Sequence, residues 1–105
     1  MIKTILNAAG LPSGQGRVPN PPGGTYAVYF DDVTADGPDG YNRIFTHEIM
    51  VELYEPKHDD EAEAALEAEL NTRGIPWTKQ ARYWLDSIRR YQVVYEFAYI
   101  EKRRT

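Results

Sequence analysis

The chain has 105 residues and no cysteine, with a formal net charge of −4 and a hydrophobic fraction of 42%. This length predicts a single domain, residues 1–105, which can bury a core without metal ions or disulfides. The missing cysteines exclude disulfides, thiol nucleophiles and cysteine-based zinc sites.

Membrane insertion and secretion are not indicated by the sequence. No apolar run approaches the roughly 18 to 20 residues that cross a bilayer. The first ten residues lack the apolar stretch and the cleavage site of a secretory signal. We therefore expect no membrane partner and a protein that is intracellular when it is made.

A short helix followed by a loop is predicted for residues 1–24. Apolar residues recur at helical spacing in residues 1–9, and Gly10 with Pro12 ends that pattern. Residues 11–24 are crowded with proline and glycine, so we expect a flexible loop that contains no helix or central strand.

Two strands joined by a wide turn are predicted next. Residues 25–30 are rich in aromatic and β-branched side chains, and the Asp-Gly-Pro-Asp-Gly stretch at 36–40 is a turn cluster. Residues 41–54 alternate between apolar and polar, which is typical of a half-buried strand with one wet face. Residues 31–40 are the expected hairpin loop.

A second helix is predicted after Pro56. Asp59 or Asp60 can cap its start, because a carboxylate accepts hydrogen bonds from the free amides of the first turn. Gly74 supplies a left-handed end. The acidic residues between 59 and 69 are expected to form a solvated helix face.

One long strand is predicted in the last third of the chain. Residues 77–85 fit a strand, a turn and a strand, or a partly helical segment. Residues 91–101 alternate with a period of two, and residues 102–105 are a basic tail. The element order predicts an α+β fold of two layers: an antiparallel sheet of about four strands with two helices on one face.

The reactive motifs in the sequence are all incomplete. Gly14 and Gly16 lack the Gly-Lys-Ser/Thr of a P-loop, and a calcium loop that began at Asp32 would need glutamate where Arg43 stands. His47 and His58 are not spaced as metal ligands, and His47 is expected to be an ordinary, semi-buried strand residue. We therefore expect no enzyme activity, no cofactor and no metal.

Charge is unevenly spread along the chain, with acids concentrated in residues 1–70 and bases in residues 71–105. Such asymmetry can steer partners, or the two segments can lie beside each other in the fold. Basic residues near the C-terminus alternate with aromatics, as in single-strand nucleic-acid binders. The overall acidity nevertheless disfavours direct nucleic-acid binding.

The aromatic side chains, 12% of the chain, favour a protein interface, because tyrosine and tryptophan combine apolar area with a polar atom. Trp77, Tyr83 and Trp84 are the candidate interface or core anchors. Arg89 and Arg90 are the candidate contacts to a neighbouring subunit.

Several stretches resemble short proteins encoded by prophages of Gram-positive bacteria. They are residues 25–29, 36–40, 47–56, 77–80 and 91–97. The chain is similar over nearly its whole length to the tail-completion, or tail-terminator, family, the head–tail joining proteins of long-tailed phages.

This resemblance implies a sheet with packed helices and a structural role in virion assembly. Such proteins form a ring, commonly a hexamer, that caps the tail tube and joins it to the head connector protein. DNA passes through the ring without sequence-specific binding. The expected location is the virion, and the bacterial cytoplasm during assembly. The short first helix and the long loop depart from the family, and a head–tail adaptor fits comparably well.

Within a ring, the acidic segment 55–70 and the basic segment 73–104 could supply complementary charge between subunits. Loops 11–24 and 31–40 could become ordered on docking, and an acidic lumen would repel DNA phosphates. The alternative function is a small monomeric protein- or peptide-binding domain of regulatory type.

Overall fold

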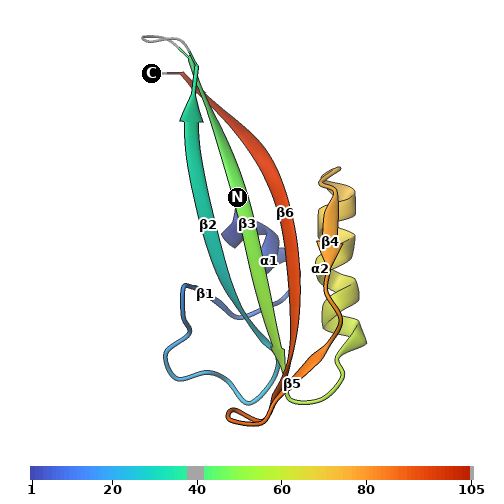
Figure 1. Cartoon of the computed structure of the whole chain (residues 1–105). Coiled ribbons are helices and arrows are strands. Elements are labelled where there is room, and N and C mark those ends of the chain that lie inside the picture. Colours follow the sequence, from blue (N-terminus) through green and yellow to red (C-terminus); the bar gives the residue numbers. More distant parts are fainter. Residues whose placement is uncertain (38–41, 105) are drawn as a thin grey trace.

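In the computed structural model, two helices cover one face of a six-stranded sheet (Figure 1). The structure describes residues 1–37 and 42–104, except for the side chains of residues 42, 43 and 104. The elements in chain order are α1 (Ile2–Ala8), β1 (Ser13–Gln15), β2 (Tyr26–Asp36), β3 (Asn42–Glu55), α2 (Asp60–Thr72), β4 (Trp77–Lys79), β5 (Tyr83–Leu85) and β6 (Arg90–Arg104). The predicted α+β class is confirmed.

The prediction of about four strands was too low, because β1, β4 and β5 have three residues each. Strands β4 and β5 match the strand, turn and strand alternative for residues 77–85, whereas β1 was not expected. The sheet order is β1-β2-β3-β6-β4, and β5 also pairs with β6. Strands β2, β3 and β6 form its antiparallel centre, while β1 lies parallel to β2.

The central strands extend well past the helices, and the molecule measures 49 × 27 × 21 Å (Figure 1). We call this extension the tongue; it comprises residues 30–36, 42–48 and 98–104. Two predictions were wrong here. Residues 31–36, expected in a loop, continue β2, and residues 102–104, expected to be a tail, continue β6. These polar segments are strands because their backbones pair with β3. Residues 38–41 of the predicted loop, and residue 105, lie outside the described residues.

The proline- and glycine-rich segment 11–24 contains strand β1, which was not expected. The Gly16 amide donates to the Tyr29 carbonyl at 2.9 Å, and the Ala27 amide donates to the Pro12 carbonyl at 2.8 Å. Proline is tolerated at such an edge because only its carbonyl is used. Further along, Arg90 Nη2 donates to the carbonyls of Pro22 and Gly23.

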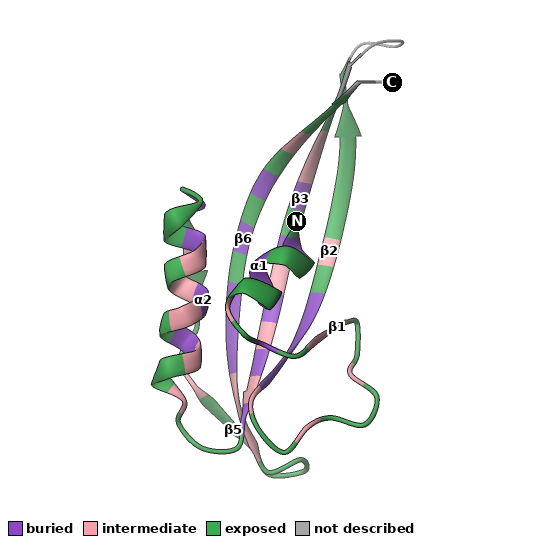
Figure 2. Cartoon of the chain, turned by 180° about the vertical axis from the view of Figure 1, so that it is seen from behind, coloured by how far each residue is buried: buried purple, intermediate pink, exposed green. Residues whose placement is uncertain are grey.

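The core lies between the helices and the odd-numbered residues of β2, β3 and β6. Figure 2 shows this side of the sheet, with the buried residues of both helices turned toward it. The fully buried side chains include Ile5, Leu6, Val51, Leu53, Leu66, Leu70, Val93 and Tyr95. Their packing explains why the alternation seen in the sequence predicted the two long strands correctly.

Helix α2 begins and ends as the sequence indicated. The Asp59 carboxylate accepts a hydrogen bond from the Ala62 amide at 3.0 Å, so Asp59, and not Asp60, is the cap. Gly74 follows the helix with φ 69°, a left-handed conformation that suits glycine. Neither helix of the described chain is both long enough and apolar enough to span a membrane.

Candidate functional site: the open face of the sheet

The side of the sheet opposite the helices is its open face, formed by the even-numbered residues of β2, β3 and β6. Strand register sets these residues in rows. One row is Asp32, Glu48 and Ala98, and the next is Phe30, Met50 and Glu96. Because side chains alternate along a strand, the pattern that buries odd positions leaves this face bare.

Carboxylates dominate the charge of this face: Asp32, Asp36, Glu48, Glu52 and Glu96. Asp32 and Glu48 stand directly opposite each other on β2 and β3, an arrangement that costs stability. In the part of the face that the structure describes, the two basic side chains, Arg90 and Lys102, lie at opposite ends of β6. The middle of the open face is therefore a negative surface.

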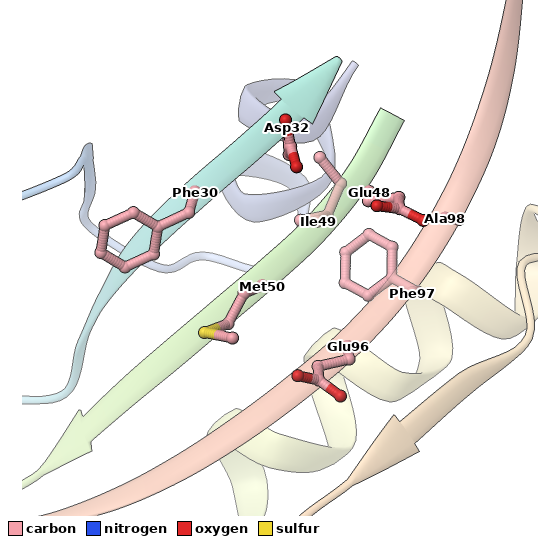
Figure 3. Close-up of a pocket in the computed structure, with 8 residues that line it drawn as sticks. All are labelled: Phe30, Asp32, Glu48, Ile49, Met50, Glu96, Phe97 and Ala98. Carbon is pink, nitrogen blue, oxygen red and sulfur yellow. The ribbon is translucent and has the colours of Figure 1, made fainter. Parts of the chain in front are cut away.

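Apolar side chains lie among these acids. Phe30 and Ile100 are 43% and 63% exposed. Figure 3 shows Phe30, Met50 and Glu96 side by side on their three strands, lining a shallow depression of about 520 Å³. Apolar side chains among polar groups make this depression a candidate contact surface.

Next to Glu52, the Tyr54 hydroxyl donates to the Glu52 carboxylate at 2.8 Å and accepts from Gln92 at 3.1 Å. Burial and then the bond to Glu52 raise the pKa of Tyr54 to about 12. The phenol therefore keeps its proton and is a fixed hydrogen-bond donor to Glu52 on the open face.

On the opposite face, His47 joins two strands of the tongue. Its Nδ1 lies 2.9 Å from Asp31, its Nε2 lies 2.9 Å from Glu101, and its ring stacks on Tyr99. Burial lowers the pKa of His47, but the two carboxylates raise it more, so the net pKa is above the usual value. His47 is buried and paired twice. The sequence did not reveal this, because its partners lie 16 and 54 residues away.

A second ionic cluster lies under α2, where a solvated acidic face was predicted. Glu63 is only 3% exposed and binds both Lys79, at 2.7 Å, and Arg82, at 2.6 Å. Arg82 also reaches the fully buried Glu55 and the exposed Asp60. The prediction was therefore wrong for Glu63, and acidic and basic segments lie beside each other within one chain. Much of the charge that was expected to join subunits is paired internally.

The buried carboxyls of this cluster titrate in opposite directions. Burial, followed by its hydrogen bond with Glu63, raises the pKa of Glu55. Burial also opposes ionisation of Glu63, but hydrogen bonds from Glu55, Lys79 and Arg82 outweigh it and lower its pKa. At neutral pH, Glu63 is therefore charged, whereas Glu55 is only partly ionised.

The predicted interface residues do not form one cluster. Trp77, in β4, is half-buried; its Nε1 donates to Asn71 and its ring meets Tyr95 edge to face. Tyr83 and Trp84 are 64% and 39% exposed on β5, at the end of the sheet away from the tongue.

The two predicted arginines lie next to β5. Arg89 is exposed and adopts φ 53° just before β6, while Arg90 binds the carbonyls of the 11–24 segment. Trp77 and Arg90 are thus engaged inside the chain, whereas Tyr83, Trp84 and Arg89 remain exposed.

Sequence inspection missed the open face itself, although its signal was present. The even-numbered acids of the long strands were recognised as a wet face, but their alignment across three strands needs the register. In the described ranges, no group of three or more His, Asp or Glu side chains is placed to hold a metal ion.

No family model matches the chain, and no curated protein matches it in sequence. Among solved structures, its fold is similar to a chain in the virion of a native gene transfer agent particle. The TM-score is 0.56 at 15% sequence identity, covering 90% of this chain and 81% of the other. At this identity, the likeness shows a shared fold.

Proposed function

We propose that the chain is a structural virion-assembly protein that caps a phage tail tube and joins it to the head connector. Several copies would form a ring around the path of the DNA. The observation that carries the proposal is a sheet with one helix-covered face and one bare, acidic face. Its support is that the gene transfer agent virion contains a chain of the same fold.

The chemistry of the open face suits a surface along which DNA slides. Asp32, Glu48 and Glu96 repel phosphate, and the middle of the face presents no described cation that would hold the backbone. Helices α1 and α2 pack on the other face, so they would lie outside the ring (Figure 2).

The two ends of the molecule differ, which suits two different protein neighbours. The tongue ends in basic residues, with Lys102 and Arg103 exposed. The opposite end exposes Tyr83, Trp84 and Ile88, side chains typical of a protein contact. We propose that one end meets the tail tube and the other meets the head connector, and that the chain catalyses no reaction.

Removal of the gene from a phage or prophage that encodes this chain tests the proposal. We expect tails of abnormal length that do not join heads, seen by electron microscopy, with rescue by the wild-type gene. Tails of normal length that join heads normally would refute it.

A further inference from the structure

The tongue has two long edges that no other strand covers in the described part of the chain. Strand β1 pairs with β2 only at residues 27–29, so residues 30–36 form an open edge. Strands β4 and β5 pair with β6 only at residues 95–97 and 90–92. Residues 98–104 of β6 therefore form the second open edge.

The backbone groups at both edges point outward in a known order. The Tyr29 carbonyl and the Ala27 amide bond to the β1 side. The backbone N–H and C=O groups of the odd residues of β2 therefore point toward this edge, away from β3. The register with β3 is continuous, so Val33 continues this order on the tongue. On β6, the Val94 carbonyl accepts a hydrogen bond from the Gln80 amide. The backbone N–H and C=O groups of even residues such as Ile100 therefore point toward the β6 edge, away from β3.

The two edges carry opposite charge. The β2 edge holds Asp31, Asp32 and Asp36. The β6 edge holds Lys102 and Arg103 with one acid, Glu101, so its described side chains are net basic. Pairing of two β2 edges would set acid against acid, and pairing of two β6 edges would set base against base. Only a β2 edge against a β6 edge joins unlike charges, and such a contact is heterologous.

Strand direction permits this contact in a ring. Both β2 and β6 run antiparallel to β3, so they run in the same direction. Rotation about an axis roughly along the strands keeps that direction. A neighbouring copy related by rotation would therefore present its β6 edge parallel to β2.

We propose that copies of this chain join by parallel pairing of the β6 edge of one tongue with the β2 edge of the next. This inference deepens the proposed function, because it rests on a ring and names the contact that builds it. Each tongue contributes three strands to a closed barrel lined by the open face. Closure also removes the exposed edges, which are otherwise sites of aggregation.

The absence of cysteine allows a direct test by disulfide trapping. Thr34 and Ile100 lie in one row of the open face, on either side of Thr46. Within one chain they are two strand spacings apart, about 9.6 Å, which is too far for a disulfide. A disulfide in the Thr34→Cys, Ile100→Cys variant must therefore join two chains.

Parallel pairing can be staggered by two residues, so Thr34→Cys is also combined with Ala98→Cys and with Lys102→Cys. The matched control is Val33→Cys with Ile100→Cys, because these side chains point to opposite faces of the sheet. After mild oxidation of the purified chain, non-reducing electrophoresis is expected to show a ladder of multimers. One of the three pairs should give about tenfold more of it than the control.

If none of the three pairs gives more multimer than the control, the edge contact is wrong. Such a negative result is informative because disulfide trapping detects even a minor population of paired chains. This result is independent of the gene-removal experiment. A ladder from a chain whose loss leaves tails normal would support the contact and refute the virion function. Abnormal tails without a ladder would support the virion function and refute the edge contact.

Discussion

Arg82 Nη2 lies 2.6 Å from Glu63 Oε2, and this ion pair ties the segment after β4 to helix α2. The same guanidinium contacts the buried Glu55 at 3.3 Å. Two carboxyls that are almost inaccessible to water thus share one partly exposed arginine, and Glu63 also binds Lys79.

Arg82→Ala is expected to lower the free energy of unfolding by about 2–3 kcal/mol, because it leaves buried carboxyls with one cation fewer. Arg82→Lys should recover only part of the loss, since an ammonium cannot bridge three carboxyls in the same geometry. Urea denaturation measures both. The exposed Arg17→Ala is the control and should change little; an equal loss there would contradict the argument.

Glu55→Gln is expected to remove part of the pH dependence of stability. The folded-state pKa of Glu55 lies above its unfolded value, so its contribution is complete below about pH 4.5 and is lost as pH rises through the folded value. The variant should therefore match the wild type near pH 5 and exceed it by about 1–2 kcal/mol at pH 8. Denaturation at both pH values measures the difference, and equal effects at the two would contradict it.

His47→Gln is expected to weaken the tongue by about 1–2 kcal/mol at pH 6, because a neutral amide replaces a charged link between Asp31 and Glu101. The folded-state pKa of His47 is raised, so its contribution is complete below about pH 6.5 and is lost as pH rises through that higher value. The loss should shrink toward pH 9. Hydrogen exchange of tongue amides measures it, with the exposed His58→Gln as control.

Asp59→Ala is expected to cost about 1 kcal/mol of unfolding free energy, because the Ala62 amide loses its partner. The Asp59 carboxylate also accepts from the Thr25 hydroxyl, so the start of α2 would detach from the segment before β2. Thermal denaturation measures the change. Glu61→Ala, an exposed change in the same turn, should cost only a few tenths of a kcal/mol.

Glu48→Lys with Glu96→Lys is expected to turn the open face into a DNA-retaining surface. The double variant should retard duplex DNA at low salt, and the effect should fade as salt increases, whereas the wild type should not bind. Gel retardation over a salt series measures this. A pair of changes with the same charge on helix α2, Glu61→Lys and Glu69→Lys, separates the effect of position from that of net charge.

The sequence was sufficient for the features that depend on local pattern. Alternation predicted β3 and β6, and Asp59 and Gly74 predicted both ends of α2. It was insufficient where distant segments decide the outcome. The last six residues of β2, 31–36, and residues 102–104 look like loop and tail in the sequence. They become strands only because β3 provides a partner for each.

The same distinction holds for the candidate site. Nothing near Glu48 in the sequence shows that Asp32 and Glu96 share its face, because that depends on the register of three strands. Trp77 and Arg90 were selected by residue type, and both make contacts within the chain. Tyr83 and Trp84 were selected in the same way and remain available to a partner.

The shared direction of β2 and β6 has a geometric consequence for assembly. If successive copies pair along their strand edges, each added copy is rotated by a constant angle relative to the one before it. The twist of the three central strands sets this angle. The number of copies is then a property of curvature, and no individual side chain encodes it. A substitution that flattens or tightens the arc would change the stoichiometry while leaving every contact chemically intact.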